Sequence, residues 1–270
     1  MTRIVFLISR LTCLELLQNK AFRILLTAAA IAPMASFIFS NLFMQNIGKV
    51  FIDGLLALNH LFAWLFILFF TAPLLGRDLE SKTCYFLLCP PVTRNQYLIG
   101  RFIGLLLIFL LLFAVLAISG TLITWVLFDS SYVAYMAGLT LTSPVSIAFF
   151  LFLNYLSVMG AVIFIFSWAT GIAELMLFSS AILFLSWIFP PVLNALQNPE
   201  VAKQAPSWST FLLDSIYQLL PHLNGTTIAT SIAYGEKIPL IHILAFSFEH
   251  ISYVMIGVLL ASIIFKKRDL

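Results

Sequence analysis

The fold is decided around one charged stretch, GRDLESKTCYFLLCPPVTRNQYLIGR (Gly76–Arg101). Between Gly54 and Gly171 the chain has seven charged residues, and six of them lie in this stretch; the seventh is Asp129. The tracts on either side are apolar and exceed the roughly 20 residues that a helix needs to cross a bilayer. The pattern predicts a membrane protein with one charged internal loop, which we expect to be presented to a soluble partner.

The composition supports the same class of protein. Of the 270 residues, 62% are hydrophobic and 9% are charged, whereas soluble domains have about 25% charged residues. The net charge of +3 is explained by membrane topology, so no nucleic-acid partner is expected. We interpret residues 1–270 as a single transmembrane domain without a soluble module.

Hydropathy predicts an all-α membrane protein with six transmembrane helices. The third and fourth helices come from one long apolar tract, which we divide at the polar cluster Asp129–Tyr132 and at Pro144. The expected spans are Ile24–Gln45, Leu55–Leu75, Phe102–Phe128, Pro144–Thr170, Leu175–Leu196 and Ile238–Phe265.

The distribution of Lys and Arg predicts the orientation of these helices. One set of connections contains only Lys49, Lys203 and Lys237, and the other side of the membrane has the remaining eleven of the 14 basic residues. Because cytoplasmic loops are enriched in Lys and Arg, both termini are expected in the cytoplasm.

Two segments outside the spans have patterns of their own. Residues 3–20 place Ile4, Leu7, Ile8 and further leucines at three- and four-residue steps, which predicts an amphipathic helix lying on the membrane. Residues 194–239 form the only sizeable extracytoplasmic segment, where Ser207–Leu220 is expected to include a short helix.

Several motifs resemble those of the permease subunits of type-2 ABC exporters, which have six spanning helices per subunit. The loop between the second and third spans of that family has an acidic residue, a Gly/Ser–Thr pair, leucines, Pro-Val, Ser/Thr-Arg, an aromatic residue and Gly-Lys/Arg. The matching residues are Glu80-Ser-Lys-Thr83, Leu87-Leu88, Pro91-Val-Thr-Arg94, Gln96-Tyr97 and Gly100-Arg101. This chain departs from the pattern at Ser81, where glycine is common, and at the additional Lys82.

Two further segments carry the resemblance. The C-terminal Phe265-Lys-Lys-Arg-Asp-Leu270 is similar to the aromatic, basic and Asp-Leu ending of the family. The segments Leu220–Asn224 and Tyr234–Glu236 look like the region before the last span in copper-enzyme-maturation permeases.

The resemblance implies a permease subunit that exports a hydrophobic or amphipathic substrate across a bacterial inner (plasma) membrane. It implies two separate ATPase subunits per complex, which bind ATP and Mg, and a second permease copy or homologue. The chain contains no Gly-x4-Gly-Lys-Ser/Thr nucleotide-binding motif, so we expect no enzymatic activity and no cofactor in this chain.

In such a permease, the loop of residues 77–101 would be a coupling loop, with a helix through Asp78–Leu88 that Pro90-Pro91 would end. The alternative is that its charges only anchor the loop at lipid headgroups. The residues expected to face the ATPase are Arg77, Asp78, Glu80, Lys82 and Arg94.

Polar residues within the spans are the other candidate site. Glu249 and His250 lie near the middle of the last span and Asn154 near the middle of the fourth. Ionisable groups at this depth often mark functional sites, so a proton or metal path is one interpretation. We favour a polar clasp between helices, with Asn154 as a possible hydrogen-bond partner. Asn59 and His60 are interpreted as snorkelling side chains at the outer end of the second span.

Metal binding is not expected, because Cys84 and Cys89 lack the paired spacing of a zinc site and have no nearby histidine. Three other functions stay open beside the exporter: a haem-export-like permease, an intramembrane enzyme that uses Glu249 and His250, and an assembly scaffold that does not transport.

Overall fold

The computed structural model describes residues 2–42, 47–80, 92–128, 140–196, 215–236 and 238–267, and the regular secondary structure in this part of the chain is helical. Six of the helices are long and apolar enough to cross a membrane. The prediction of an all-α protein with six spanning helices is therefore confirmed.

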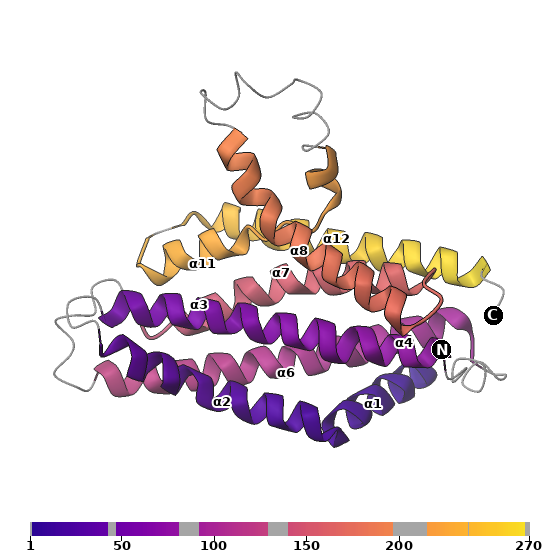
Figure 1. Cartoon of the computed structure of the whole chain (residues 1–270), viewed down its shortest axis with the longest axis horizontal. Coiled ribbons are helices and arrows are strands. Elements are labelled where there is room, and N and C mark those ends of the chain that lie inside the picture. The colour runs from indigo at the N-terminus through magenta and orange to yellow at the C-terminus, as the bar shows by residue number, and fades with distance from the viewer. Residues whose placement is uncertain are drawn as a thin grey trace.

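The helices follow one another in a simple order (Figure 1). They are α1 (Thr2–Gln18), α2 (Lys20–Ser40), α3 (Ile47–Phe66), the π-helical turn η1 (Ile67–Thr71), α4 (Ala72–Glu80), α6 (Arg94–Phe128), α7 (Ser143–Phe166), α8 (Ile172–Leu196), α11 (Gly225–Ala233) and α12 (Leu240–Lys267). The segments α3, η1 and α4 form one continuous span.

Several spans are longer than hydropathy predicted. The second span begins at Ile47 instead of Leu55, and the third begins at Arg94 instead of Phe102. Hydropathy detects the apolar part of a helix, whereas the backbone stays helical through the polar turns at its ends. The division of the long apolar tract is confirmed, because α6 ends at Phe128 and α7 begins at Ser143.

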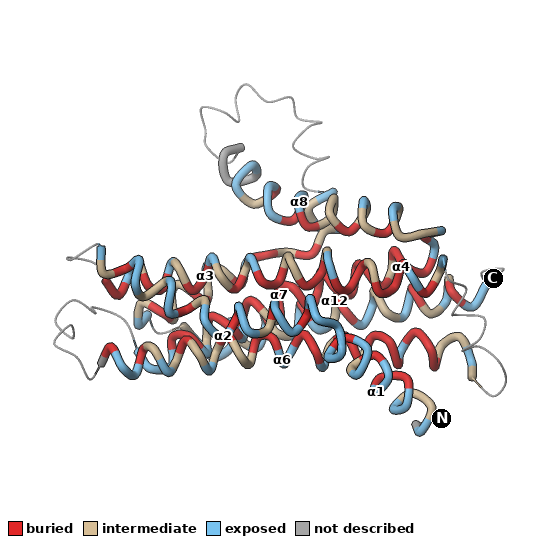
Figure 2. The backbone as a smooth tube through the Cα atoms, turned by 60° about the horizontal axis from the view of Figure 1, so that its bottom comes forward, coloured by how far each residue is buried: buried red, intermediate tan, exposed pale blue. Residues whose placement is uncertain are grey.

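Helix α7 is the centre of the bundle. It packs against α12, α6, α11, α3 and α8, and most of its residues are buried (Figure 2). A helix that is apolar on all sides is typical of such a central position. The phenylalanines Phe22, Phe66, Phe109 and Phe152 join it to α2, α3 and α6 through a chain of ring contacts.

Helix α8 leans away from the bundle (Figure 1). Its main contacts are with α4, η1 and α7, and it leaves large apolar side chains such as Phe184 and Trp187 exposed. On the neighbouring span, the π-helical turn η1 precedes Pro73, which has no N–H to donate to the helix. Within η1, the N–H of Ala72 bonds the carbonyl of Ile67, five residues earlier.

The N-terminal helix predicted for residues 3–20 is observed as α1, and Asn19 caps the start of α2 by accepting a hydrogen bond from Ala21 N at 2.9 Å. Its position on a membrane surface stays a prediction. One side of α1 packs along α6, burying Ile8, Thr12 and Leu16. Of the predicted apolar stripe, Leu7, Leu11, Leu14 and Leu17 are exposed together, whereas Ile8 belongs to the buried side.

Gly100 and Gly104 allow this close packing. A Cβ atom at Gly104 would lie 2.6 Å from Thr12 Cβ and 2.8 Å from the Ser9 carbonyl oxygen, and one at Gly100 would lie 2.7 Å from Ile8 Cβ. Pairs of small residues four apart let helix backbones approach in this way. The two glycines thus fix α1 against the beginning of α6.

Candidate functional site

Charged residues gather where α4 ends, α6 begins and α12 ends. We call this region the charged end; its described members are Arg77, Asp78, Glu80, Arg94, Arg101, Lys266 and Lys267. Both termini of the chain lie at this end of the bundle (Figure 1), as an even number of spans requires.

Arg101 is the centre of a buried ion-pair cluster that joins three helices. Its side chain is 2% exposed and donates hydrogen bonds to Asp78 Oδ1 on α4 at 2.8 Å and to Glu15 Oε2 on α1 at 2.8 Å. It also donates to Thr12 Oγ1 at 3.1 Å. Tyr97 donates its hydroxyl proton to Asp78 Oδ2. Partners on both sides of the guanidinium compensate for the cost of burying its charge.

This arrangement differs from the sequence prediction for Asp78. The prediction placed its carboxylate against a soluble partner, but the side chain is only 5% exposed and points to Arg101. One helical step of about 100° separates it from the exposed Arg77. Charge alone did not distinguish the inner from the outer side of the helix.

Glu80 and Arg94 tie the two flanks of the predicted coupling loop to other helices. Glu80 Oε1 accepts a hydrogen bond from Ile172 N at the start of α8, at 2.9 Å. Arg94 Nη1 donates to the carbonyl oxygens of Phe265 and Lys266 at the end of α12, both at 3.4 Å. Lys82 and most of the helix expected over Asp78–Leu88 lie outside the described residues, where only Asp78–Glu80 are seen, within α4.

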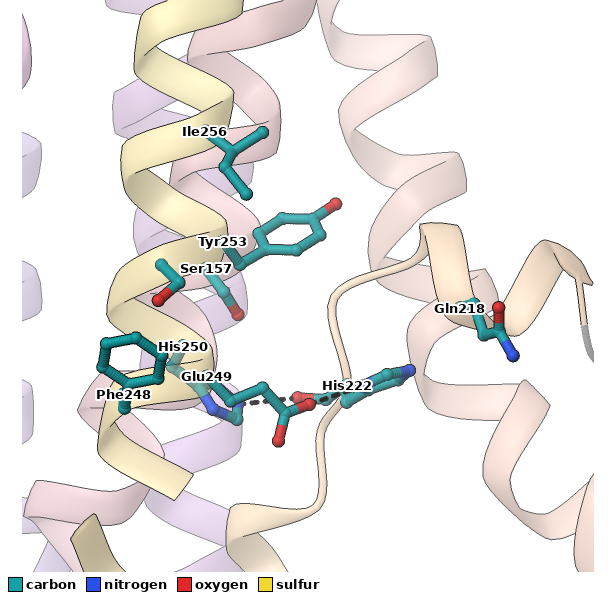
Figure 3. Close-up of a pocket in the computed structure, with 9 residues that line it drawn as sticks. Ser157, Gln218, His222, Phe248, Glu249, His250, Tyr253 and Ile256 are labelled. Carbon is teal, nitrogen blue, oxygen red and sulfur yellow. Dashed lines mark hydrogen bonds and ion pairs between the residues drawn. The ribbon is translucent and has the colours of Figure 1, made fainter. Parts of the chain in front are cut away.

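A second polar region lies between α12, α7 and the segment that precedes α11 (Figure 3). It surrounds a cavity of about 450 Å³, and we call it the polar pocket. The residues that line it are Ser157, Gln218, His222, Phe248, Glu249, His250, Ser252, Tyr253 and Ile256.

His222 and Glu249 form the ionisable pair of this pocket. His222 Nδ1 lies 2.8 Å from Glu249 Oε1, and its Nε2 lies 3.0 Å from the carbonyl oxygen of Tyr217. A neutral imidazole has one N–H, so with an ionised Glu249 both contacts are hydrogen bonds only when the ring is protonated. Both ring nitrogens of His222 therefore have a partner, and neither is left to act as the general base that an intramembrane enzyme with a serine nucleophile would need. Burial raises the pKa of Tyr217, whose hydroxyl donates to Asn224 Oδ1 at 3.2 Å.

His250 and Asn154 hold the same segment from the inside of the bundle. His250 is 2% exposed and its Nε2 lies 3.0 Å from the carbonyl oxygen of His222. Asn154 is fully buried, and its Oδ1 accepts a hydrogen bond from Gly225 N at 3.1 Å. His250 Nδ1 lies 3.0 Å from the carbonyl oxygen of Phe246, and because both neighbours of the ring are acceptors, a neutral ring donates to only one of them.

The polar groups of the fourth and last spans meet at one connecting segment, whereas the clasp interpretation joined the helices directly. Glu249, His250 and Asn154 all contact the segment of residues 217–225 and not one another. The sequence analysis missed His222 and Gly225, because a single histidine or glycine in a connection carries no spacing signal.

The interpretation of Asn59 and His60 as snorkelling side chains is wrong. Asn59 is 3% exposed, and His60 joins three helices in a hydrogen-bond network. Trp64 can only donate, so the Tyr155 oxygen accepts from it at 2.9 Å and gives its own proton to His60 Nδ1 at 2.5 Å. His60 Nε2 then donates to Thr226 Oγ1 on α11 at 3.4 Å.

Within the described residues, no group of three or more His, Cys, Asp or Glu side chains is arranged to hold a metal ion. Cys84 and Cys89 lie outside them. Comparison of the sequence with protein-family models and with curated proteins finds no match. The proposed function therefore rests on the geometry of the charged end and the polar pocket.

Proposed function

We propose that this multi-pass membrane protein is the permease subunit of an ATP-binding-cassette exporter. It couples ATP hydrolysis by separate ATPase subunits to the export of a hydrophobic or amphipathic substrate. The observation that carries the proposal is the set of contacts at the charged end. The flanks of the loop between α4 and α6 are bonded to α1, α8 and α12.

These contacts suit the transmission of force. A push on the loop acts on α4 and α6, and through Glu80, Arg94 and Arg101 it reaches three further helices. Packed helices respond to such a push by moving as rigid bodies. A loop that only anchors the protein at lipid headgroups has no need of bonds to the ends of so many helices.

The partners follow from this mechanism. Two ATPase subunits dock at the charged end, bind ATP and Mg, and face the cytoplasm of a bacterial plasma membrane. A second copy of the chain or a homologue completes the complex. The exposed Arg77, together with Lys82, contacts the ATPase, while Glu80 and Arg94 position the loop.

The test is ATP hydrolysis by the purified complex. The tagged chain is isolated from its native host in mild detergent, and vanadate-sensitive ATPase activity is measured in the eluate. We expect activity with the wild-type chain and at least a fivefold loss with Arg77→Glu combined with Lys82→Glu. The matched control is Glu236→Lys, because Glu236 is exposed beyond α11, outside the charged end. Wild-type eluate without ATPase activity contradicts the proposal.

A further inference from the structure

Glu249 is the only residue of fixed charge among the described residues that line the polar pocket, which include no Lys or Arg. It lies nine residues after the start of α12 at Leu240, or about 14 Å along the helix. Its side chain is 52% exposed. An exposed carboxylate at this depth of a spanning helix is costly unless a cation accompanies it.

His222 satisfies only part of this requirement. Its Nδ1 contacts one carboxylate oxygen, Oε1, from a side chain that is itself 22% exposed. More than half of the Glu249 side chain still faces the cavity and its surroundings. The close-up shows Glu249 reaching from α12 toward the segment that carries His222, with the Tyr253 ring further along α12 (Figure 3). The Phe248 and Tyr253 rings are among the residues that line the pocket, and aromatic rings attract organic cations.

An apolar stripe continues from Glu249 along α12. Four residues follow Glu249 at steps that keep them on its side of the helix: Tyr253, Ile256, Leu260 and Ile263. Three of them are strongly exposed, Ile256 at 57%, Leu260 at 45% and Ile263 at 55%. From Tyr253 to Ile263 the stripe is about 15 Å long at 1.5 Å per residue. The polar pocket thus lies at one end of a surface that is long enough for a hydrocarbon tail.

We propose that the polar pocket binds the cationic amine headgroup of an amphiphile, with Glu249 as its counter-ion and the tail along the stripe from Tyr253 to Ile263. The cation competes with His222 for the Glu249 carboxylate, so binding releases the ion pair that joins α12 to the segment of residues 217–225. Because the lining offers no Lys or Arg, it has no fixed positive charge for a phosphate or sulfate headgroup. The inference deepens the proposed function by naming the headgroup of the substrate, and it rests on that proposal only for the transport of the ligand.

The test uses the purified chain alone in dodecyl maltoside, without any ATPase. A negative binding result therefore contradicts the ligand site and leaves the proposed coupling to an ATPase untouched. Three photoreactive probes with the same diazirine-bearing hexadecyl tail are compared: an amine, an alcohol and a sulfate. Mass spectrometry locates the label. We expect the amine to label residues 215–224 and 249–263 at least fivefold more than the other two probes.

Two controls make the assignment specific. Glu249→Gln should lower amine labelling at least fivefold, whereas Glu236→Gln, outside the pocket, should leave it unchanged. In the wild-type chain, unlabelled hexadecyltrimethylammonium should compete for the label and a neutral maltoside should not, which tests the site even if Glu249→Gln does not fold. Equal labelling by amine and alcohol, stronger labelling by the sulfate, or full labelling of a folded Glu249→Gln variant overturns the proposal.

Discussion

Arg101 ends the predicted coupling loop, yet its side chain is buried between helices. Its guanidinium contacts Asp78, Glu15 and Thr12, from two other helices. The sequence placed it at the end of the loop without assigning its side chain a partner, because partners on separate helices share no spacing with it. The cluster is what connects α1 to the rest of the charged end.

The cluster predicts unequal effects of two substitutions. Arg101→Ala removes the cation that faces the buried Asp78 carboxylate, and breaking a buried ion pair in this way costs about 3–5 kcal/mol. Glu15→Gln removes only the charge of a partner whose side chain is 49% exposed, so its cost should be about 0–1 kcal/mol. The free energy of unfolding in an SDS titration measures both. Equal losses for the two variants would show that Arg101 is not buried among these partners.

The polar residues of the pocket region divide between stability and binding. Asn154→Leu leaves the buried N–H of Gly225 without an acceptor, which should lower the free energy of unfolding by about 1–3 kcal/mol. Glu249→Gln changes a half-exposed side chain and should leave the protein folded, as judged by its elution profile and melting temperature. A Glu249→Gln variant that unfolds while Asn154→Leu is stable would reverse this assignment.

At the scale of elements, hydropathy was sufficient for the six spans and insufficient for α11. Helix α11 has the sequence GTTIATSIA (Gly225–Ala233), which is short and rich in threonine. It is helical because it packs on α7 and α3 and because Asn154 and His60 bond to its first turn. Such tertiary contacts override the weak intrinsic preference of the segment.

Helix α1 offers a direct test of the close contact at Gly104. Gly104→Ala places a Cβ atom within 2.6 Å of Thr12 Cβ and 2.8 Å of a backbone oxygen, so α1 must move away from α6. Amide hydrogen exchange in residues 2–18 should then become at least tenfold faster. Gly120→Ala on the same helix meets Pro144 Cβ at 3.0 Å and serves as the control. Unchanged exchange in both variants would mean that α1 does not pack through this contact.

Helix α8 should depend on Glu80 for its first turn. Glu80→Ala removes the acceptor of the Ile172 N–H and a negative charge next to a helix N-terminus, both of which stabilise that end. Hydrogen exchange of residues 171–176 should become faster in this variant. Glu80→Gln keeps the acceptor oxygen and loses only the charge, so its exchange should lie between that of Glu80→Ala and that of the wild type. If the two variants exchange alike, the hydrogen bond does not hold the helix.

At the scale of the whole molecule, α12 connects the two polar regions. Its last turn is bonded to Arg94 at the charged end, and Glu249 and His250 lie in its first half, at the polar pocket. A movement of the loop flanks therefore acts on the same helix that holds the segment of residues 217–225. The distribution of Lys and Arg predicted that charge gathers at one end of the bundle. The bonds that link this end to the pocket depend on how the helices pack, and helix packing cannot be predicted from the pattern of charges.

Reversal of both charges that flank the loop, Glu80→Arg with Arg94→Glu, should uncouple the complex. The bundle should stay folded, because its core lies in α7 and the helices around it. The measurement is ATPase activity of the isolated complex, with the elution profile as the control for folding. Normal stimulation of the partner ATPase by this double variant would show that the loop is not the coupling element.

The most direct test of the central claim is native mass spectrometry of the chain purified from its own host in mild detergent. The proposal predicts a complex with one ATP-binding subunit for each permease subunit, two of each in total. It also predicts that this subunit is lost from the Arg77→Glu, Lys82→Glu variant while the permease stays folded. A wild-type chain that carries no ATP-binding subunit would contradict the proposed function.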